Sequence, residues 1–146
     1  MTAKGPGQVL FGFVRHWSRR SSPGDYAAAE QGRLVLVTES VHALMERGIA
    51  ATVNAVAHEI GIDQSGASRM IKSATEAGYL SMRASRTDAR CREAALTSAG
   101  RSMLKQAHHW QEQVFDQLTV GWSDRRRDDF QRAMADLVDR SNALDV

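Results

Sequence analysis

The sequence predicts a mainly α-helical fold that carries one small β-hairpin. Both prolines, Pro6 and Pro23, stand before residue 24, so the rest of the 146-residue chain lacks the residue that most strongly interrupts helices. Apolar residues recur there with the three- and four-residue spacing of helices. This spacing gives way to strict alternation after Gly78, where Leu80 and Met82 alternate with polar residues, as in a half-buried strand.

Two helices are predicted in the N-terminal third, over about 7–20 and 25–47. The break between them is Ser21-Ser22-Pro23-Gly24, and Asp25 is a good N-cap for the helix that follows. Gly48 supplies the C-terminal stop of the second helix. The predicted apolar face of this helix consists of Leu34, Val37, Val41, Leu44 and Met45.

Two helices separated by a tight turn come next. Thr52 caps a short helix that ends at Gly61, and Asp63 caps a fourth helix over about 63–77. A hairpin follows, with strands over about 80–85 and 91–96. This order of two helices, a tight turn and a hairpin predicts a winged helix-turn-helix.

Two longer helices complete the predicted chain. Their N-caps are Thr97 and Ser123. The sixth helix has an apolar stripe that a single small domain cannot easily cover, which consists of Phe130, Met134, Leu137 and Val138. A second uncovered stripe lies at the other end of the chain, at Val9, Phe13 and Trp17. Pairing two copies of the chain would bury both stripes.

Charge is concentrated in one segment. The net charge is only +2, yet residues 64–92 contain six basic and two acidic side chains. A local basic stripe in a nearly neutral protein is expected where a surface meets phosphates, although a solvated face would give the same count. No apolar run approaches the roughly 18 residues of a membrane span, and no signal-peptide pattern opens the chain. We expect a cytoplasmic protein.

The outer face of the fourth predicted helix carries chemistry for nucleic acid. Ser65, Ser68, Arg69 and Lys72 follow the helical repeat on the side opposite the apolar residues. The serines, together with Gly66, let the backbone approach base edges in the major groove of double-stranded DNA. Arg69 can fork onto guanine, and Lys72 can neutralise a phosphate.

The hairpin adds a second candidate DNA-binding element. It carries four arginines within ten residues, Arg83, Arg86, Arg90 and Arg92. Arg90 near the tip suits the adjacent minor groove, whose width and potential favour arginine, and Asp88 can hold it in place. We predict DNA contacts from the hairpin at Arg86, Asp88 and Arg90.

Several motifs in the middle of the chain resemble those of the multiple-antibiotic-resistance-regulator (MarR) family of winged-helix repressors. They are Val56-Ala57-His58-Glu59-Ile60-Gly61-Ile62, Gln64-Ser65-Gly66-Ala67-Ser68-Arg69-Met70-Ile71, Ala77-Gly78-Tyr79-Leu80, Asp88-Ala89-Arg90 and, after five intervening residues, Leu96-Thr97-Ser98-Ala99-Gly100. The last two motifs at this spacing are specific to the family. By resemblance, the outer residues of the fourth helix fall at major-groove positions and Arg90 at the wing tip.

The resemblance also implies an obligate homodimer built by the first, fifth and sixth helices. Residues 1–24 and 98–146 would form the helical dimerisation region, and residues 25–97 the winged helix-turn-helix DNA-binding domain. Such a dimer would bind a near-palindromic operator. A ligand crevice between the helical arms and the winged domain is implied as well, so we expect a ligand-responsive repressor.

The helical arms carry the side chains that could line this crevice. The candidates are Arg15, His16, Trp17, Tyr26 and Trp110. A small aromatic or phenolic anion would suit such a lining, whereas packing in the core or at the dimer interface is the alternative role. We expect no other cofactor.

Histidines and the single cysteine invite other interpretations. His42, His108, His109 and Glu112 could in principle bind zinc, but adjacent histidines face different ways on a helix, so we predict no metal site. Cys91 lies between two arginines. Redox sensing by an exposed thiol is therefore an alternative to a small buried residue of the hairpin.

No catalytic residues are predicted. The sequence has no nucleophile elbow, no glycine-rich phosphate loop and no metal motif, so we do not expect an enzyme. A winged helix used for protein contacts is a further alternative. The polar outer face of the fourth helix argues against it, because protein-binding faces favour exposed apolar anchors.

Overall fold

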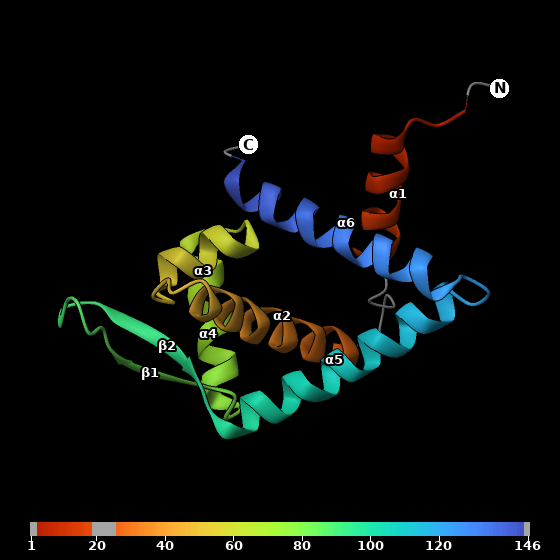
Figure 1. Ribbon diagram of the computed structural model, residues 1–146. Coiled ribbons are helices and arrows are strands. Elements are labelled where there is room, and N and C mark those ends of the chain that lie inside the picture. Colours follow the sequence, from red (N-terminus) through yellow and green to blue (C-terminus); the bar gives the residue numbers. More distant parts are fainter. Residues whose placement is uncertain (1–2, 19–25, 145–146) are drawn as a thin grey trace. The chain divides into compact units, whose positions relative to one another are not determined.

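The computed structural model describes residues 3–18 and 26–144, with the backbone alone described at 26–28 (Figure 1). The chain forms two compact units, Met1–Gln106 and Ala107–Val146. The described helices and strands are α1 (Pro6–Ser18), α2 (Tyr26–Glu46), α3 (Val53–Ile60), α4 (Gln64–Glu76), β1 (Leu80–Ala84), β2 (Arg92–Leu96), α5 (Ser98–Leu118) and α6 (Asp124–Ala143). The mainly α-helical class with one hairpin is confirmed, while the predicted cap Asp25 lies outside the described residues.

The core of the first unit lies where α2, α3, α4 and the hairpin meet. Four of the five predicted apolar positions of α2 face it, since Leu34, Val37, Val41 and Leu44 are buried. Met45 is instead 36% exposed. It follows Leu44 directly, which turns its side chain about 100° around the helix axis from the buried stripe.

The turn between α3 and α4 is built as the sequence predicts. The Thr52 hydroxyl accepts a hydrogen bond from the Ala55 amide and caps α3, and Gly61 ends α3 with a left-handed φ of 80°. Asp63 then caps α4 by accepting from the Gly66 amide at 3.2 Å. The left-handed glycine and the immediate restart of the helix fix the angle between α3 and α4.

The hairpin is anchored on one side and free at its tip. β1 and β2 pair antiparallel, with Leu80 opposite Leu96 and Ala84 opposite Arg92. The Ala94 amide also donates to the Ala51 carbonyl at 2.8 Å, which fastens β2 to the segment between α2 and α3. Residues 84–92, which contain the tip, are half-buried or exposed.

The start of α5 is locked against the turn after α4. The Thr97 hydroxyl caps α5 by accepting from the Gly100 amide at 3.0 Å, and it donates to the Gly78 carbonyl at 2.5 Å. The Thr97 amide donates to the Tyr79 carbonyl at 3.1 Å. A Cβ on Gly100 would lie 2.2 Å from that same carbonyl oxygen, so only glycine fits there.

The second unit holds the end of α5 and all of α6. Ser123 caps α6, as predicted, by accepting from the Arg126 amide. The rings of Phe115 and Phe130 stack at 6.2 Å, and Trp122 meets Phe130 edge-on at 5.5 Å. In the part of the chain that the structure describes, no helix combines the length and apolarity that crossing a bilayer requires.

Candidate nucleic-acid interface

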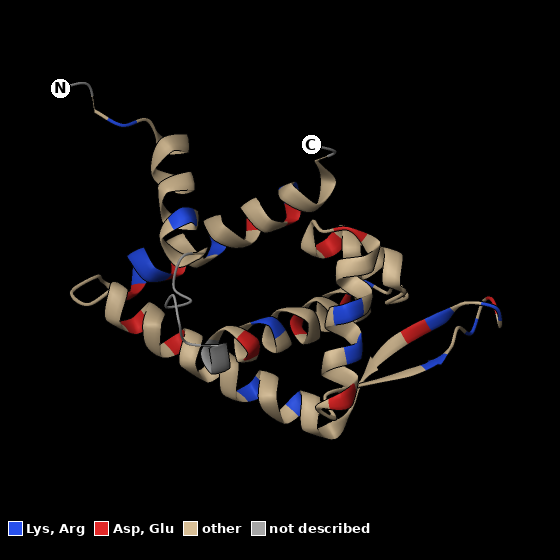
Figure 2. Ribbon diagram, turned by 180° about the vertical axis from the view of Figure 1, so that it is seen from behind, with Lys and Arg blue, Asp and Glu red and all other residues tan. Residues whose placement is uncertain are grey.

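The two faces of α4 separate as the sequence predicts. Ala67, Ile71 and Ala74 are buried against the core. Ser65, Ser68, Arg69 and Lys72 are exposed. Basic residues colour α4 and the hairpin in Figure 2. The exposed face therefore has small hydroxyl side chains at the N-terminal end of α4 and cations further along.

Gly66 lies on the flank of α4 rather than among the exposed serines. It is half-buried, and a Cβ built on it would come within 2.7 Å of the Asp63 carboxylate oxygen that caps the helix. Glycine at this position therefore leaves room for the N-cap. The structure gives Gly66 this role within the fold, and its predicted approach to DNA stays a prediction.

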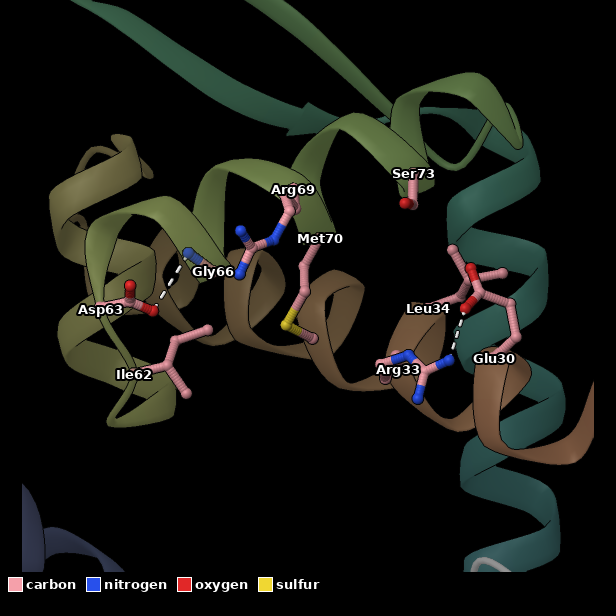
Figure 3. A pocket seen from close by; sticks show the side chains of 9 residues that line it. All are labelled: Glu30, Arg33, Leu34, Ile62, Asp63, Gly66, Arg69, Met70 and Ser73. Carbon is pink, nitrogen blue, oxygen red and sulfur yellow. Dashed lines mark hydrogen bonds and ion pairs between the residues drawn. The ribbon is translucent and has the colours of Figure 1, made fainter. Parts of the chain in front are cut away.

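Arg69 is exposed but extends over a pocket between α2 and α4 (Figure 3). The pocket has a volume of about 320 Å³. Its lining residues are Glu30, Arg33, Leu34, Ile62, Asp63, Gly66, Arg69, Met70 and Ser73. Arg33 and Glu30 form an ion pair at 2.8 Å, whereas no acidic side chain in the described ranges pairs with Arg69. The pocket lining thus combines apolar side chains with an arginine that has no acidic partner in the described ranges.

The hairpin tip is organised by Asp88. One carboxylate oxygen accepts from the backbone amide of Arg90 at 3.0 Å, and the other lies 3.7 Å from the Cys91 sulfur. Asp88 thus holds the backbone of Arg90 and leaves its guanidinium free to turn toward a partner. Arg86, Asp88 and Arg90 are all exposed, as a DNA-binding wing requires.

The predicted effector residues are only partly placed. Arg15, His16 and Trp17 share the last two turns of α1, where the rings of His16 and Trp17 meet edge-on at 5.7 Å. Trp110 is 57% exposed on α5 and belongs to the other unit. Tyr26 begins α2, but its side chain is outside the description. The effector-binding role of these five residues stays a prediction.

The surroundings of the histidines and of Cys91 bear on the metal and redox interpretations. Within residues 3–18 and 26–144, no three histidine, cysteine or acidic side chains gather as metal ligands would. His42 lies between Glu39 and Glu46 on α2, at 3.8 and 3.7 Å. Cys91 is exposed, so the interpretation of it as a buried hairpin residue is wrong. The reason is that the hairpin extends beyond the core before Cys91 is reached.

One ion pair joins the end of α2 to the helix-turn-helix. Arg47 donates to both carboxylate oxygens of Glu59 in α3, at 3.1 and 2.5 Å. The hydrogen bond from Arg47, opposed by partial burial, lowers the pKa of Glu59, and the same bond raises the pKa of Arg47. Two parallel bonds of this kind fix orientation as well as distance, so the pair braces α3 against α2.

Sequence reasoning missed the pocket and this brace. Glu30 and Arg33 are three residues apart, which is a signal of a helical ion pair but not of a pocket. Arg47 and Glu59 lie twelve residues apart on different helices, and nothing in the local pattern links them. Both features depend on how α2 packs across α3 and α4.

The fold and the exposed cationic faces together define a winged helix-turn-helix protein. No protein-family model and no curated protein matches the sequence. Solved structures do match. A mutant MarR from E. coli is 17% identical, covers 94% of this chain and 99% of its own, and has a TM-score of 0.66. The chain therefore has the MarR fold, which the sequence resemblance implied.

Two further neighbours have the same fold. A mutant MepR from S. aureus is 11% identical over 90% of this chain and 96% of its own, with a TM-score of 0.63. BpsR from Bordetella bronchiseptica is 19% identical over 95% of this chain and 96% of its own, with a TM-score of 0.61. The DNA binding of BpsR is regulated by 6-hydroxynicotinic acid.

Proposed function

We propose that this protein is a MarR-type transcription regulator that binds double-stranded DNA and catalyses no reaction. The observation that carries the proposal is the exposed face of α4, where two serines precede Arg69 and Lys72 on a helix whose other face is buried. A helix of this kind presents base-reading and phosphate-binding groups together. As a chromosomal DNA-binding protein, it would act in the cytoplasm.

The wing supports the same function. Arg90 lies beside a turn that Asp88 stabilises, and its guanidinium has no acidic partner within the described part of the chain. An arginine held only through its backbone keeps the freedom to enter a minor groove. We assign Arg69 to base reading, Arg90 to the minor groove and Lys72 to a phosphate.

The exposed apolar stripes support a homodimer. Phe130, Met134, Leu137 and Val138 of α6 are each at least 36% exposed, and no residue of α1 is buried. Contiguous exposed apolar stripes are typical of surfaces that a partner covers. Two copies related by a two-fold axis would present their α4 helices about 34 Å apart, which matches a near-palindromic operator.

A small aromatic carboxylate is the effector class that we propose, with release of DNA as its effect. The lining of the pocket between α2 and α4 includes the apolar side chains of Leu34, Ile62 and Met70 together with Arg69. A carboxylate bound there would occupy an arginine that DNA needs. BpsR, which responds to such a compound, has the same fold. The protein would then be a ligand-responsive repressor.

Binding titrations test the proposal. The DNA flanking the protein's own reading frame supplies the operator, and a scrambled duplex supplies the comparison. Arg69→Ala should weaken operator binding by about 1–3 kcal/mol and affect scrambled DNA less. Arg125→Ala is a matched control, because it removes the same charge from a side chain of α6 that is 89% exposed.

Two results would contradict the assignment. The first is equal loss of operator and scrambled binding in Arg69→Ala, which would make Arg69 a phosphate contact. The second is an absence of binding to any duplex by the wild-type dimer at low salt, which would refute the function itself.

An added aromatic carboxylate should weaken operator binding, and Arg33→Ala, a change at the pocket rather than on the outer face, should alter that response.

A further inference from the structure

One wing arginine differs from the other three in its surroundings. Arg83 of β1 lies directly opposite Glu93 of β2 in the ladder, and its Nε donates to the Glu93 carboxylate at 3.0 Å. In the described residues, no acidic side chain pairs with Arg86, Arg90 or Arg92. The hairpin therefore has one arginine that is paired within the strand ladder, and three arginines closer to the tip that have no acidic partner in the described residues.

Glu93 is the buried member of the pair. Its side chain is 9% exposed, whereas that of Arg83 is 48% exposed. The residue after Glu93 is fastened to Ala51 by a backbone hydrogen bond, so the segment between α2 and α3 covers this part of β2. Arg83 and Glu93 line one groove of about 490 Å³ with Met45 of α2 and Ile49 of the segment after it.

Because Glu93 is buried and Arg83 is not, loss of the ion pair costs Glu93 much more free energy than it costs Arg83. A carboxylate removed from water needs a partner, because an unpaired buried charge is strongly destabilising. Arg83 could exchange Glu93 for a phosphate at little cost to itself, but Glu93 would then be left unpaired. The free-energy cost of leaving Glu93 unpaired therefore keeps Arg83 in the ion pair.

We propose that Glu93 is a positioning residue that withholds Arg83 from DNA. The inference rests on the proposed DNA-binding function, and it limits the number of wing arginines that contact DNA. Only Arg86, Arg90 and Arg92 then meet the duplex. Phosphate contacts raise affinity for every sequence alike, whereas base contacts raise it for the operator. By keeping one cation out of the interface, Glu93 lowers sequence-independent binding, so base contacts supply a larger share of the total binding free energy.

The salt dependence of binding measures the number of phosphates that are neutralised. Glu93→Gln should free Arg83 and steepen the slope of log K against log salt by about 0.9 for each wing, or about 1.8 for a dimer. With that slope, a fourfold fall in salt would raise affinity about 12-fold more than it does for the wild type. The gain should appear on operator and scrambled DNA together.

Three further variants separate this effect from a structural one. The double variant Arg83→Gln with Glu93→Gln should return the slope to the wild-type value, because the freed cation is gone. Arg83→Gln alone should leave the slope unchanged, whereas Arg86→Gln should lower it by about 0.9 per wing. If either single variant at this pair fails to fold, the contrast between the double variant, whose slope should equal that of the wild type, and Arg86→Gln still tests the proposal.

The outcomes that overturn the inference are distinct from those that overturn the function. An unchanged or shallower slope in Glu93→Gln, or a steeper slope that persists in the double variant, refutes the withholding role. A slope that falls equally in Arg83→Gln and Arg86→Gln refutes it as well, since Arg83 would then contact phosphate. If wild-type protein fails to bind DNA, the proposed function fails first.

Discussion

Replacement of Gly100 by alanine should destabilise the protein through a single close contact. The new Cβ would lie 2.2 Å from the Tyr79 carbonyl oxygen and 3.1 Å from its carbon. Both atoms belong to the backbone, so no side chain can rotate away to make room. Either α5 must shift or the turn after α4 must open.

The expected cost follows from the bonds at that junction. A shift of about 1 Å would weaken the hydrogen bonds of Thr97 to Tyr79 and Gly78, at about 1 kcal/mol each. Strain of about 1–3 kcal/mol adds to this loss. The gain in helix propensity from glycine to alanine offsets about 1 kcal/mol. The net destabilisation is therefore about 2–4 kcal/mol, or a Tm lower by roughly 5–15 °C for a chain of this size.

Thermal and urea unfolding, followed by circular dichroism at one protein concentration, measure this cost. Gly32→Ala is the matched control, because Gly32 lies within α2 and a Cβ there would meet nothing within 4 Å. The control should be stabilised by up to about 1 kcal/mol. The reasoning is refuted if Gly100→Ala is as stable as the wild type, or gains stability as the control does.

Three other perturbations test different parts of the molecule. Because Arg47 lowers the pKa of Glu59, their pair stabilises the fold above the ordinary value of 4.5, and this contribution is lost as the pH falls through and below that value. Glu59→Gln should thus cost about 1 kcal/mol in urea unfolding at neutral pH and clearly less near pH 3, and equal costs at both would contradict this. Leu137→Asp should give monomers by light scattering at micromolar concentration, and a monomeric wild type would count against the dimer. Asp63→Ala should cost about 1 kcal/mol by removing the acceptor of the Gly66 amide, and an unchanged urea midpoint would exclude that role.

The local signals in the sequence were sufficient for most of the fold. Thr52, Asp63 and Ser123 act as caps because each side chain accepts a hydrogen bond from the amide three positions later. The switch from helical spacing to alternation placed the hairpin within one or two residues. Caps and hairpin strands depend on residues that are close in the sequence, so the sequence pattern alone can predict them.

The features that the sequence did not reveal all involve pairs of elements. The pocket beside Arg69 forms only where α2 packs against α4. The ion pair between Glu93 and Arg83 differs from a surface pair because Glu93 is buried in the part of β2 that is bonded to Ala51. Met45 is a further example: its apolar side chain predicted burial, but its position around the axis of α2 leaves it 36% exposed. Residue type indicates what could be buried, and packing decides what is.

The tip of the hairpin has a consequence for how such a protein can vary. Beyond Ala84 the two strands are joined by the bond from the Ser85 amide to the Cys91 carbonyl and by the turn at Asp88, with none of the tip's residues buried. The free energy of closing a loop grows only with the logarithm of its length, so insertions here cost little. The reach of the wing along a duplex is thus a property that sequence change can lengthen or shorten while the core below it remains intact.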